Sequence, residues 1–94
     1  MAAQATVPLE KAKRAEPTSR SIREALGIAY FRIGRWKEAE AEFRALVELA
    51  PADEFAHYAL GRALVNQGRR EEATPHIKLG RALRPRTPDG ADLE

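Results

Sequence analysis

The chain has 94 residues, no cysteine and a formal net charge of +2, with 16 Lys and Arg against 14 Asp and Glu. This length allows one small domain, and the near balance of charge argues against non-specific nucleic-acid binding as the main function. Without cysteine there is no disulfide, thiol chemistry or Cys-ligated zinc site, and no stretch reaches the roughly 20 apolar residues that a membrane span needs.

Residues 1–8 lack the positive start and the apolar run of a signal peptide. We therefore expect a cytoplasmic protein that does not enter a membrane. Ala and Arg are abundant while Lys and Asn are scarce, which favours a bacterial source with a GC-rich genome.

Residues 20–33 are predicted to form a helix, because their apolar side chains recur at spacings of three and four. Gly34 should end this helix, since glycine readily takes the left-handed conformation just past a helix end. The apolar stripe consists of Ile22, Leu26, Ala29, Tyr30 and Ile33.

Residues 36–49 predict a second helix that ends before Pro51, which has no N–H to donate. Glu40 and Arg44 are spaced to pair on its outer face. Trp36 opens this helix and is expected to pack on the preceding one. The stripe consists of Trp36, Ala39, Phe43, Leu46, Val47 and Leu49.

The second half of the chain repeats this succession. Asp53 is a plausible N-cap for a third helix, which should end at Gly68, and a fourth should end at Pro85. The two stripes consist of Phe55, Ala59, Leu60, Ala63 and Leu64, then Ala73, Ile77, Gly80 and Leu83.

Pro75 falls within the last of these segments. One reading makes Thr74 an N-cap with Pro75 at the first helical position. We favour a helix that starts near Arg70 and bends slightly at Pro75, because the pattern of the preceding helices requires Ala73 to be helical.

A fixed offset of 34 residues connects the two halves, beginning with Leu26-Gly27 and Leu60-Gly61. A repeat of this length is typical of stacked helical hairpins, which usually bind other molecules. Small residues facing each other should let the two helices of each hairpin approach closely. The offset also relates Gly34 to Gly68, Glu38 to Glu72, Ala39 to Ala73, Leu49 to Leu83 and Pro51 to Pro85.

These positions resemble the tetratricopeptide repeat family, whose pattern is Trp-x2-Leu-Gly-x2-Tyr followed by Ala-x3-Phe-x2-Ala-x4-Pro. The first repeat supplies Leu26, Gly27, Tyr30, Ala39, Phe43 and Pro51, and the second supplies Leu60, Gly61, Ala73 and Pro85. The chain departs from the pattern at Arg23, Leu46, His57, Leu64, Ile77 and Gly80. The same frame, extended backwards, fits Ala5, Leu9, Ala12 and Pro17.

The resemblance implies an all-α fold of antiparallel helix hairpins, stacked as a short right-handed solenoid of about 2.5 units and about five helices. Residues 4–17 would be the second helix of a partial N-terminal repeat. Residues 20–53 and 54–87 would be the two full repeats, and residues 88–94 a disordered polar tail.

The resemblance also implies a concave groove lined by the first helix of each repeat. A non-enzymatic adaptor, co-chaperone or scaffold would bind a peptide or partner helix there. Some of these side chains could instead pack against the first helix or the next repeat. The partner-facing positions are Ser21, Glu24, Ile28, Phe31, Arg32, Phe55, Tyr58, Arg62, Val65 and Asn66.

Some members of this family hold a C-terminal carboxylate with a clamp of Lys, Asn and Arg. The corresponding positions carry Glu24, Ile28 and Ala59, so capture of chaperone tails is not expected.

Two other functions remain open. The chain could self-associate through its end helices and act as an oligomer. Its arginines could also contact phosphates, although solvated cations near helix C-termini explain them more simply, so nucleic acid is not an expected partner. These arginines are Arg69, Arg70, Arg81, Arg84 and Arg86.

No pattern in the chain indicates catalysis, a cofactor or a metal. His57 and His76 have no acid or cysteine at ligand spacing and are expected to be surface or packing residues. Glu71 and Glu72 suit the positive end of a helix dipole, which is sufficient reason for their presence.

Overall fold

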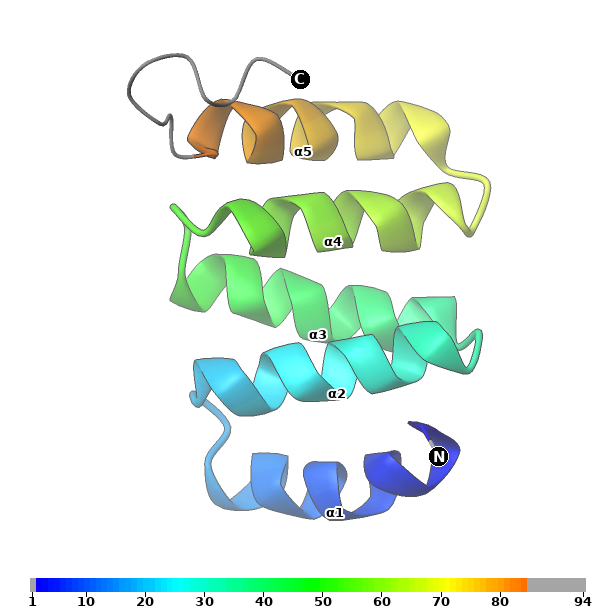
Figure 1. The fold of residues 1–94 in the computed structure, drawn as a ribbon, viewed down its shortest axis with the longest axis vertical. Helices are drawn as coiled ribbons and strands as arrows, with labels where there is room; N and C mark the ends of the chain where they lie inside the picture. Colours follow the sequence, from blue (N-terminus) through cyan, green and yellow to red (C-terminus); the bar gives the residue numbers. More distant parts are fainter. Residues whose placement is uncertain (1, 85–94) are drawn as a thin grey trace, which may run out of the picture.

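The computed structural model describes residues 2–84, which form five α-helices and no strand (Figure 1). The expected all-α architecture is therefore confirmed for this part of the chain. The expected helix end at Pro85 and the expected tail at residues 88–94 lie outside the described residues. The helices are α1 (Ala2–Ala15), α2 (Arg20–Arg32), α3 (Trp36–Leu49), α4 (Glu54–Val65) and α5 (Arg70–Leu83).

The helices stack in chain order, each antiparallel to the one before, with α1 and α5 at opposite ends (Figure 1). The most extensive packing joins α2 to α3 and α4 to α5. These are the two hairpins that the repeat predicts. Contacts between α1 and α2 and between α3 and α4 complete the stack.

The two hairpin turns have the same backbone geometry. Gly34 and Gly68 both have a φ of 79°, in the left-handed region that favours glycine. The next amide bonds back into the preceding helix in both cases. Arg35 N donates to Tyr30 O over 2.9 Å, and Arg69 N donates to Leu64 O over 3.0 Å.

Close approach within each hairpin depends on a second pair of glycines. A Cβ atom on Gly27 would lie 2.5 Å from Cε1 of Phe43, and one on Gly61 would lie 2.5 Å from Cγ1 of Ile77. Both distances are too short for real contacts, so each ring or side chain fills the space that glycine leaves. The expectation that small residues close the hairpins is confirmed.

One continuous apolar core runs through α2, α3, α4 and α5, while α1 contributes only Leu9 at its edge. The stripes predicted from sequence supply this core. Its largest fully buried side chains are Phe43, Leu26, Leu46, Leu60 and Leu64.

Helix α1 differs in position from the sequence expectation. It ends at Ala15, two residues before the expected end at residue 17, because a proline at 17 disfavours helical geometry at Glu16. The helix also contains Pro8, which cannot donate a backbone hydrogen bond.

Helix α4 ends at Val65, three residues before the expected stop at Gly68, whereas the expected cap of α4 and the expected start of α5 are confirmed. Asp53 caps α4 by accepting from Phe55 N over 2.9 Å. Helix α5 starts at Arg70 and contains Pro75. Thr74 does not cap that helix, since its Oγ1 donates to the carbonyl oxygen of Arg70 over 2.9 Å.

Candidate functional site

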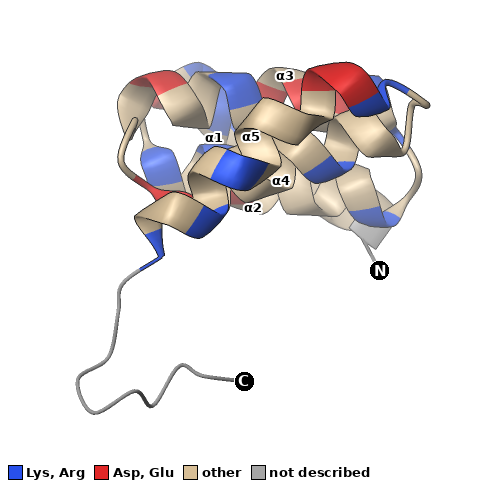
Figure 2. Ribbon diagram, turned by 90° about the horizontal axis from the view of Figure 1, so that it is seen from above, with Lys and Arg blue, Asp and Glu red and all other residues tan. Residues whose placement is uncertain are grey.

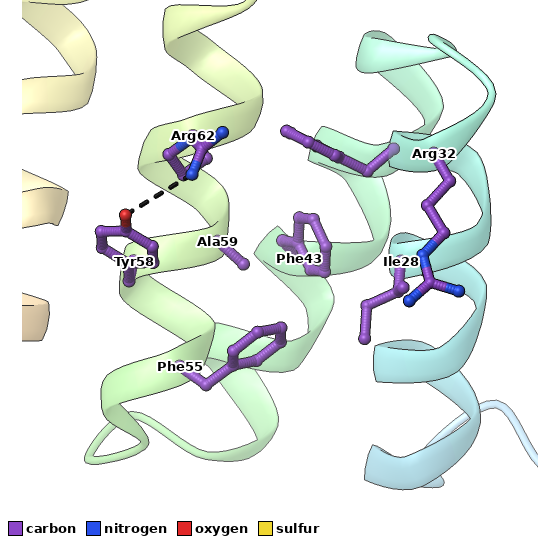
Figure 3. A pocket seen from close by; sticks show the side chains of 8 residues that line it. Ile28, Arg32, Phe43, Phe55, Tyr58, Ala59 and Arg62 are labelled. Atoms are coloured by element: carbon purple, nitrogen blue, oxygen red, sulfur yellow. Dashed lines mark hydrogen bonds between the residues drawn. The ribbon is translucent and has the colours of Figure 1, made fainter.

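An apolar hollow of about 180 Å³ opens between α2 and α4, with α3 behind it (Figure 3). We call this surface the groove. The side chains lie on three helices that the two hairpins hold together, so their relative positions depend on the core. The lining consists of Ile28, Phe31, Arg32, Phe43, Phe55, Tyr58, Ala59 and Arg62.

Edge-to-face aromatic contacts fix two sides of the groove. The ring centres of Phe55 and Phe43 lie 6.0 Å apart, with an angle of 86° between the ring planes. Those of Phe31 and Trp36 lie 5.0 Å apart, with an angle of 62° between the planes. Trp36 therefore packs on the preceding helix, as expected. Phe31 and Phe55 are both half-buried against the core, so these two predicted groove residues also take part in internal packing.

Arg62 lies above the aromatic part of the groove. Its guanidinium carbon is 5.6 Å from the centre of the Phe31 ring and 6.0 Å from that of Tyr58. Its Nη1 donates to the Tyr58 hydroxyl over 3.5 Å (Figure 3). Contacts with aromatic faces attract a cation without neutralising it. The positive charge of Arg62 therefore remains available to interact with another group.

Arg32 projects from α2 on the opposite side of the groove (Figure 3). Within residues 2–84, neither Arg32 nor Arg62 belongs to an ion pair. The groove thus combines an apolar interior with two arginines that have no carboxylate partner in the described part of the chain.

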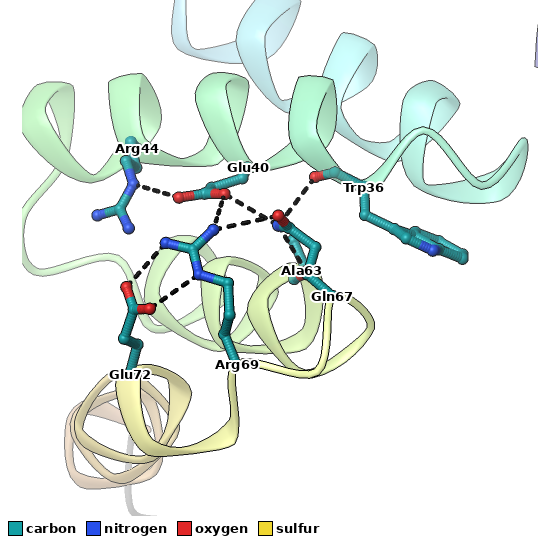
Figure 4. A network of polar contacts seen from close by, with 7 residues as sticks. All are labelled: Trp36, Glu40, Arg44, Ala63, Gln67, Arg69 and Glu72. Atoms are coloured by element: carbon teal, nitrogen blue, oxygen red, sulfur yellow. Dashed lines mark hydrogen bonds and ion pairs between the residues drawn. The ribbon is translucent and has the colours of Figure 1, made fainter.

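Arginines between α3 and the start of α5 are paired with carboxylates instead (Figure 4). Glu40 accepts from Arg44 and Arg69 over 2.8 Å each, and Arg69 also forms two 2.8 Å bonds to Glu72. Gln67 donates to Glu40 over 2.9 Å. Seen along the stack, most of the acidic segments lie on the upper edge, where α3 is labelled (Figure 2).

These bonds stabilise the ionised acids. Burial tends to raise the pKa of Glu40, but hydrogen bonds from Gln67, Arg44 and Arg69 lower it below its usual value. The hydrogen bond from Arg69 likewise lowers the pKa of Glu72. Arg69 precedes α5, so the interpretation of this arginine as a solvated cation near a helix C-terminus is wrong.

Comparison with known proteins establishes the family. The sequence family described as the bacterial transcriptional activator domain matches residues 2–83. The chain belongs to this family. No curated protein matches the chain. The resemblance to tetratricopeptide repeats therefore holds at the level of a TPR-like helical domain, although the matching family has a different name.

Solved structures of MamA share the fold of this chain. MamA MSR-1 is 32% identical with a TM-score of 0.83, covering 87% of this chain and 47% of that one. MamA AMB-1 is 33% identical with a TM-score of 0.84, covering 87% and 48%. The chain thus spans about half the length of these MamA chains, and both comparisons support a TPR-type helical solenoid.

The structure brings six of the ten predicted partner-facing residues together in the groove. Glu24 lies apart from them, in a depression that also includes Ser21, Arg20 and Asp53. Val65 is half-buried against the core, and Asn66 is the exposed C-cap of α4. Neither lines the groove.

Sequence reasoning missed Phe43 and Ala59 as groove residues. Both are buried and were assigned to the core stripe. A side chain can belong to the core and also form the wall of a hollow. The signal was the position of Ala59, one turn from Phe55 and next to Tyr58 on the helix that lines the groove.

The two histidines, His57 on α4 and His76 on α5, lie side by side. His57 is buried, and its Nε2 lies 2.7 Å from the carbonyl oxygen of Pro51. This contact requires the proton on Nε2 and leaves Nδ1 without a partner in the described residues. His57 stacks on His76 at 6.3 Å between ring centres, so both are packing residues, as expected.

Within residues 2–84, no group of three or more His, Cys, Asp and Glu residues is placed to hold a metal ion. None of the helices found there combines the length and the apolar character of a membrane span.

Proposed function

We propose that this chain is a protein-interaction module whose groove binds a peptide or helix from another protein. The observation that carries this proposal is the exposure of Tyr58 and Arg62 beside the apolar hollow. Tyr and Arg are enriched among residues that dominate binding energy, especially where a partner excludes water.

The rest of the groove is suited to binding without large rearrangement. Phe43 is buried, and its contact with Phe55 leaves the ring little freedom. A preorganised surface loses less conformational entropy when a partner docks. The TPR-like fold supports the same class of function, in an adaptor, co-chaperone or scaffold.

The family name suggests a setting. A domain of a bacterial transcriptional activator would act in the cytoplasm, and we propose that this one contacts protein rather than DNA. Its formal net charge of +2 supports that choice, since DNA binding relies on many unneutralised Lys and Arg residues. The groove offers Tyr58 and two arginines but no nucleophile–base pair, which supports a non-enzymatic role.

Affinity capture tests the proposal with the double variant Tyr58→Ser, Arg62→Gln. Both side chains are exposed, so the circular dichroism spectrum and the melting temperature should stay close to those of the original chain. The control is Lys37→Gln, Glu38→Gln on the exposed side of α3. We expect mass spectrometry to identify a protein that the original and control chains retain and the groove variant loses.

An equal yield of that protein with the groove variant would contradict the proposal. Loss of the protein with the control as well would assign binding to a different surface.

Self-association is a second candidate, favoured by two exposed apolar side chains. Val7 on α1 is 73% exposed and Leu79 on α5 is 43% exposed. These helices lie at opposite ends of the stack (Figure 1). Sedimentation velocity at increasing concentration should show dimers or larger species that Val7→Gln, Leu79→Gln abolishes. A monomer at every concentration would remove this candidate.

A further inference from the structure

We propose that the groove selects an acidic protein segment in which one large apolar side chain is flanked by Asp or Glu residues. This inference rests on the proposed function, because it specifies the chemistry of the partner that the groove would bind.

The size of the hollow limits the partner to one apolar anchor. Its volume is about 180 Å³, and an apolar cavity of about 150 Å³ admits a benzene ring. One Leu or Phe side chain would therefore fill it. Ile28, Phe55 and Ala59 would contact this anchor from α2 and α4, with the buried Phe43 ring behind.

The charge around the hollow specifies what flanks the anchor. Arg62 is held by aromatic rings, and only one of its N–H groups donates to another described residue, at the long distance of 3.5 Å. Its remaining donors can reach a carboxylate, which arginine binds with two parallel bonds. Arg32 supplies a second cation from the opposite helix.

Positive charge continues from the groove towards α5. A neighbouring depression shares Phe55 and Tyr58 with the groove and is also lined by Arg81 and Arg84. Among residues 2–84, the one carboxylate within ion-pair distance of Arg84 is that of Glu54 at 4.0 Å, and the Arg84 side chain is 65% exposed. A partner that leaves the hollow in this direction would therefore meet more cations than acids.

Arginines that serve the fold differ from those of the groove in their partners. Arg23 donates to the buried Glu42 over 3.0 Å, and Arg69 bonds to both Glu40 and Glu72 over 2.8 Å. By contrast, Arg32 and Arg62 form no ion pair within the described residues, which leaves both available to carboxylates of a partner.

Single-stranded nucleic acid also combines negative charge with flat apolar groups, but it fits this surface less well. Bases stack on exposed aromatic faces, whereas Phe31 and Phe55 are half-buried and packed edge-to-face. A hollow with room for one side chain favours a peptide, and nucleic acid binding is an outcome of the test.

Fluorescence anisotropy with four labelled probes tests this inference on the full chain. The first is a synthetic peptide with leucine between pairs of aspartates. The second replaces the aspartates by lysine, and the third replaces the leucine by serine. The fourth is single-stranded oligothymidine. We expect the first probe to bind most tightly, and its affinity to fall as salt is raised.

Charge reversal then assigns the contact. Arg62→Glu should lower the affinity for the aspartate–leucine peptide by about tenfold or more and raise the affinity for the lysine peptide. Lys37→Glu makes the same charge change on the exposed side of α3 and should leave both affinities within about twofold of the original.

Three results would overturn the inference: no binding of the first probe at its solubility limit, equal or tighter binding of the lysine peptide, or tighter binding of oligothymidine. The capture experiment separates these from failure of the proposed function. If capture depends on Tyr58 and Arg62 but the first probe does not bind, the groove binds a protein of different chemistry.

Discussion

Gly27 lies where α2 comes closest to α3, and Gly61 has the corresponding position between α4 and α5. Added Cβ atoms would meet Phe43 and Ile77 at 2.5 Å. The sequence indicates this closeness, because a glycine recurs at the same position of the 34-residue repeat within two predicted helices. Packing, rather than turn formation, therefore explains glycine within these two helices.

The variant Gly27→Ala tests this packing. Overpacking costs about 1–3 kcal/mol, while alanine gains up to about 1 kcal/mol in helix propensity. Phe43 is only 2% exposed and has little room to move, so we expect net destabilisation in urea denaturation. Phe43→Leu should then lower the free energy of unfolding by less in the Gly27→Ala chain than in the original chain. A Gly27→Ala chain of unchanged stability would contradict the close approach.

His76 predicts a response to acid. Burial lowers its pKa below the usual value, and the charges of Arg44 and His57 act in the same direction. The unfolded chain therefore takes up this proton more readily than the folded chain. The contribution to stability is complete above the unfolded pKa of about 6.5 and falls as the pH drops from there towards the folded pKa.

Urea denaturation between about pH 7.5 and pH 5 measures this effect. The variant His76→Gln should flatten the loss of stability on the acidic side. An unchanged slope in the variant would assign the acid response to other groups.

At the scale of elements, Glu42 connects three helices. It lies on α3, is 4% exposed, and accepts from Lys13 Nζ of α1 over 2.8 Å and from Arg23 Nη1 of α2 over 3.0 Å. The hydrogen bond to Glu42 raises the pKa of Lys13 above its usual value. The hydroxyl of Tyr30 adds a bond from α2 to Glu10 of α1.

Replacement of Glu42 by Gln should weaken this junction. Breaking a buried ion pair costs up to about 3–5 kcal/mol, but the Lys13 and Arg23 side chains are 23% and 20% exposed. Water can therefore reach both cations, and we expect a loss of about 2–3 kcal/mol in urea denaturation. The control Glu38→Gln, on the exposed side of α3, should stay within about 0.5 kcal/mol. Equal effects of the two substitutions would show that Glu42 does not join the helices.

The elements differ in how far sequence could predict them. Helices α2 to α5 have local signals in their stripes, caps and terminal glycines. Helix α1 follows only from the family frame. That frame ends the helix at Pro17, whereas the proline disfavours helical geometry at Glu16 and the helix ends at Ala15. The pairing of Arg69 with Glu40 joins residues 29 apart, for which no local pattern exists.

At the scale of the whole molecule, extensive packing occurs only between helices adjacent in the chain. In such a stack, stability is approximately a sum of the helix hairpins and their interfaces. An end helix has only one such interface. The groove, by contrast, is built on helices that have neighbours on both sides, so a partner would dock on the better-supported part of the stack.

Helix α1 should therefore open more easily than the helices that form the groove. Its apolar contribution to the core is Leu9, Val7 is 73% exposed, and Pro8 removes one backbone hydrogen bond. Native-state hydrogen exchange measures opening helix by helix. We expect α1 amides to exchange at a lower free energy than those of α3 and α4, because opening α1 exposes little apolar surface.

The variant Glu42→Gln makes this prediction more specific. It removes the carboxylate that accepts from Lys13, so the opening free energy of α1 should fall further. Amides of α4 and α5 do not contact this junction directly and should change mainly through global unfolding. If α1 and α4 exchange at one common free energy in both chains, the stack opens as a single cooperative unit. The weak end helix would then be as stable as the groove, and the interface between α1 and α2 would be stronger than its apolar contacts indicate.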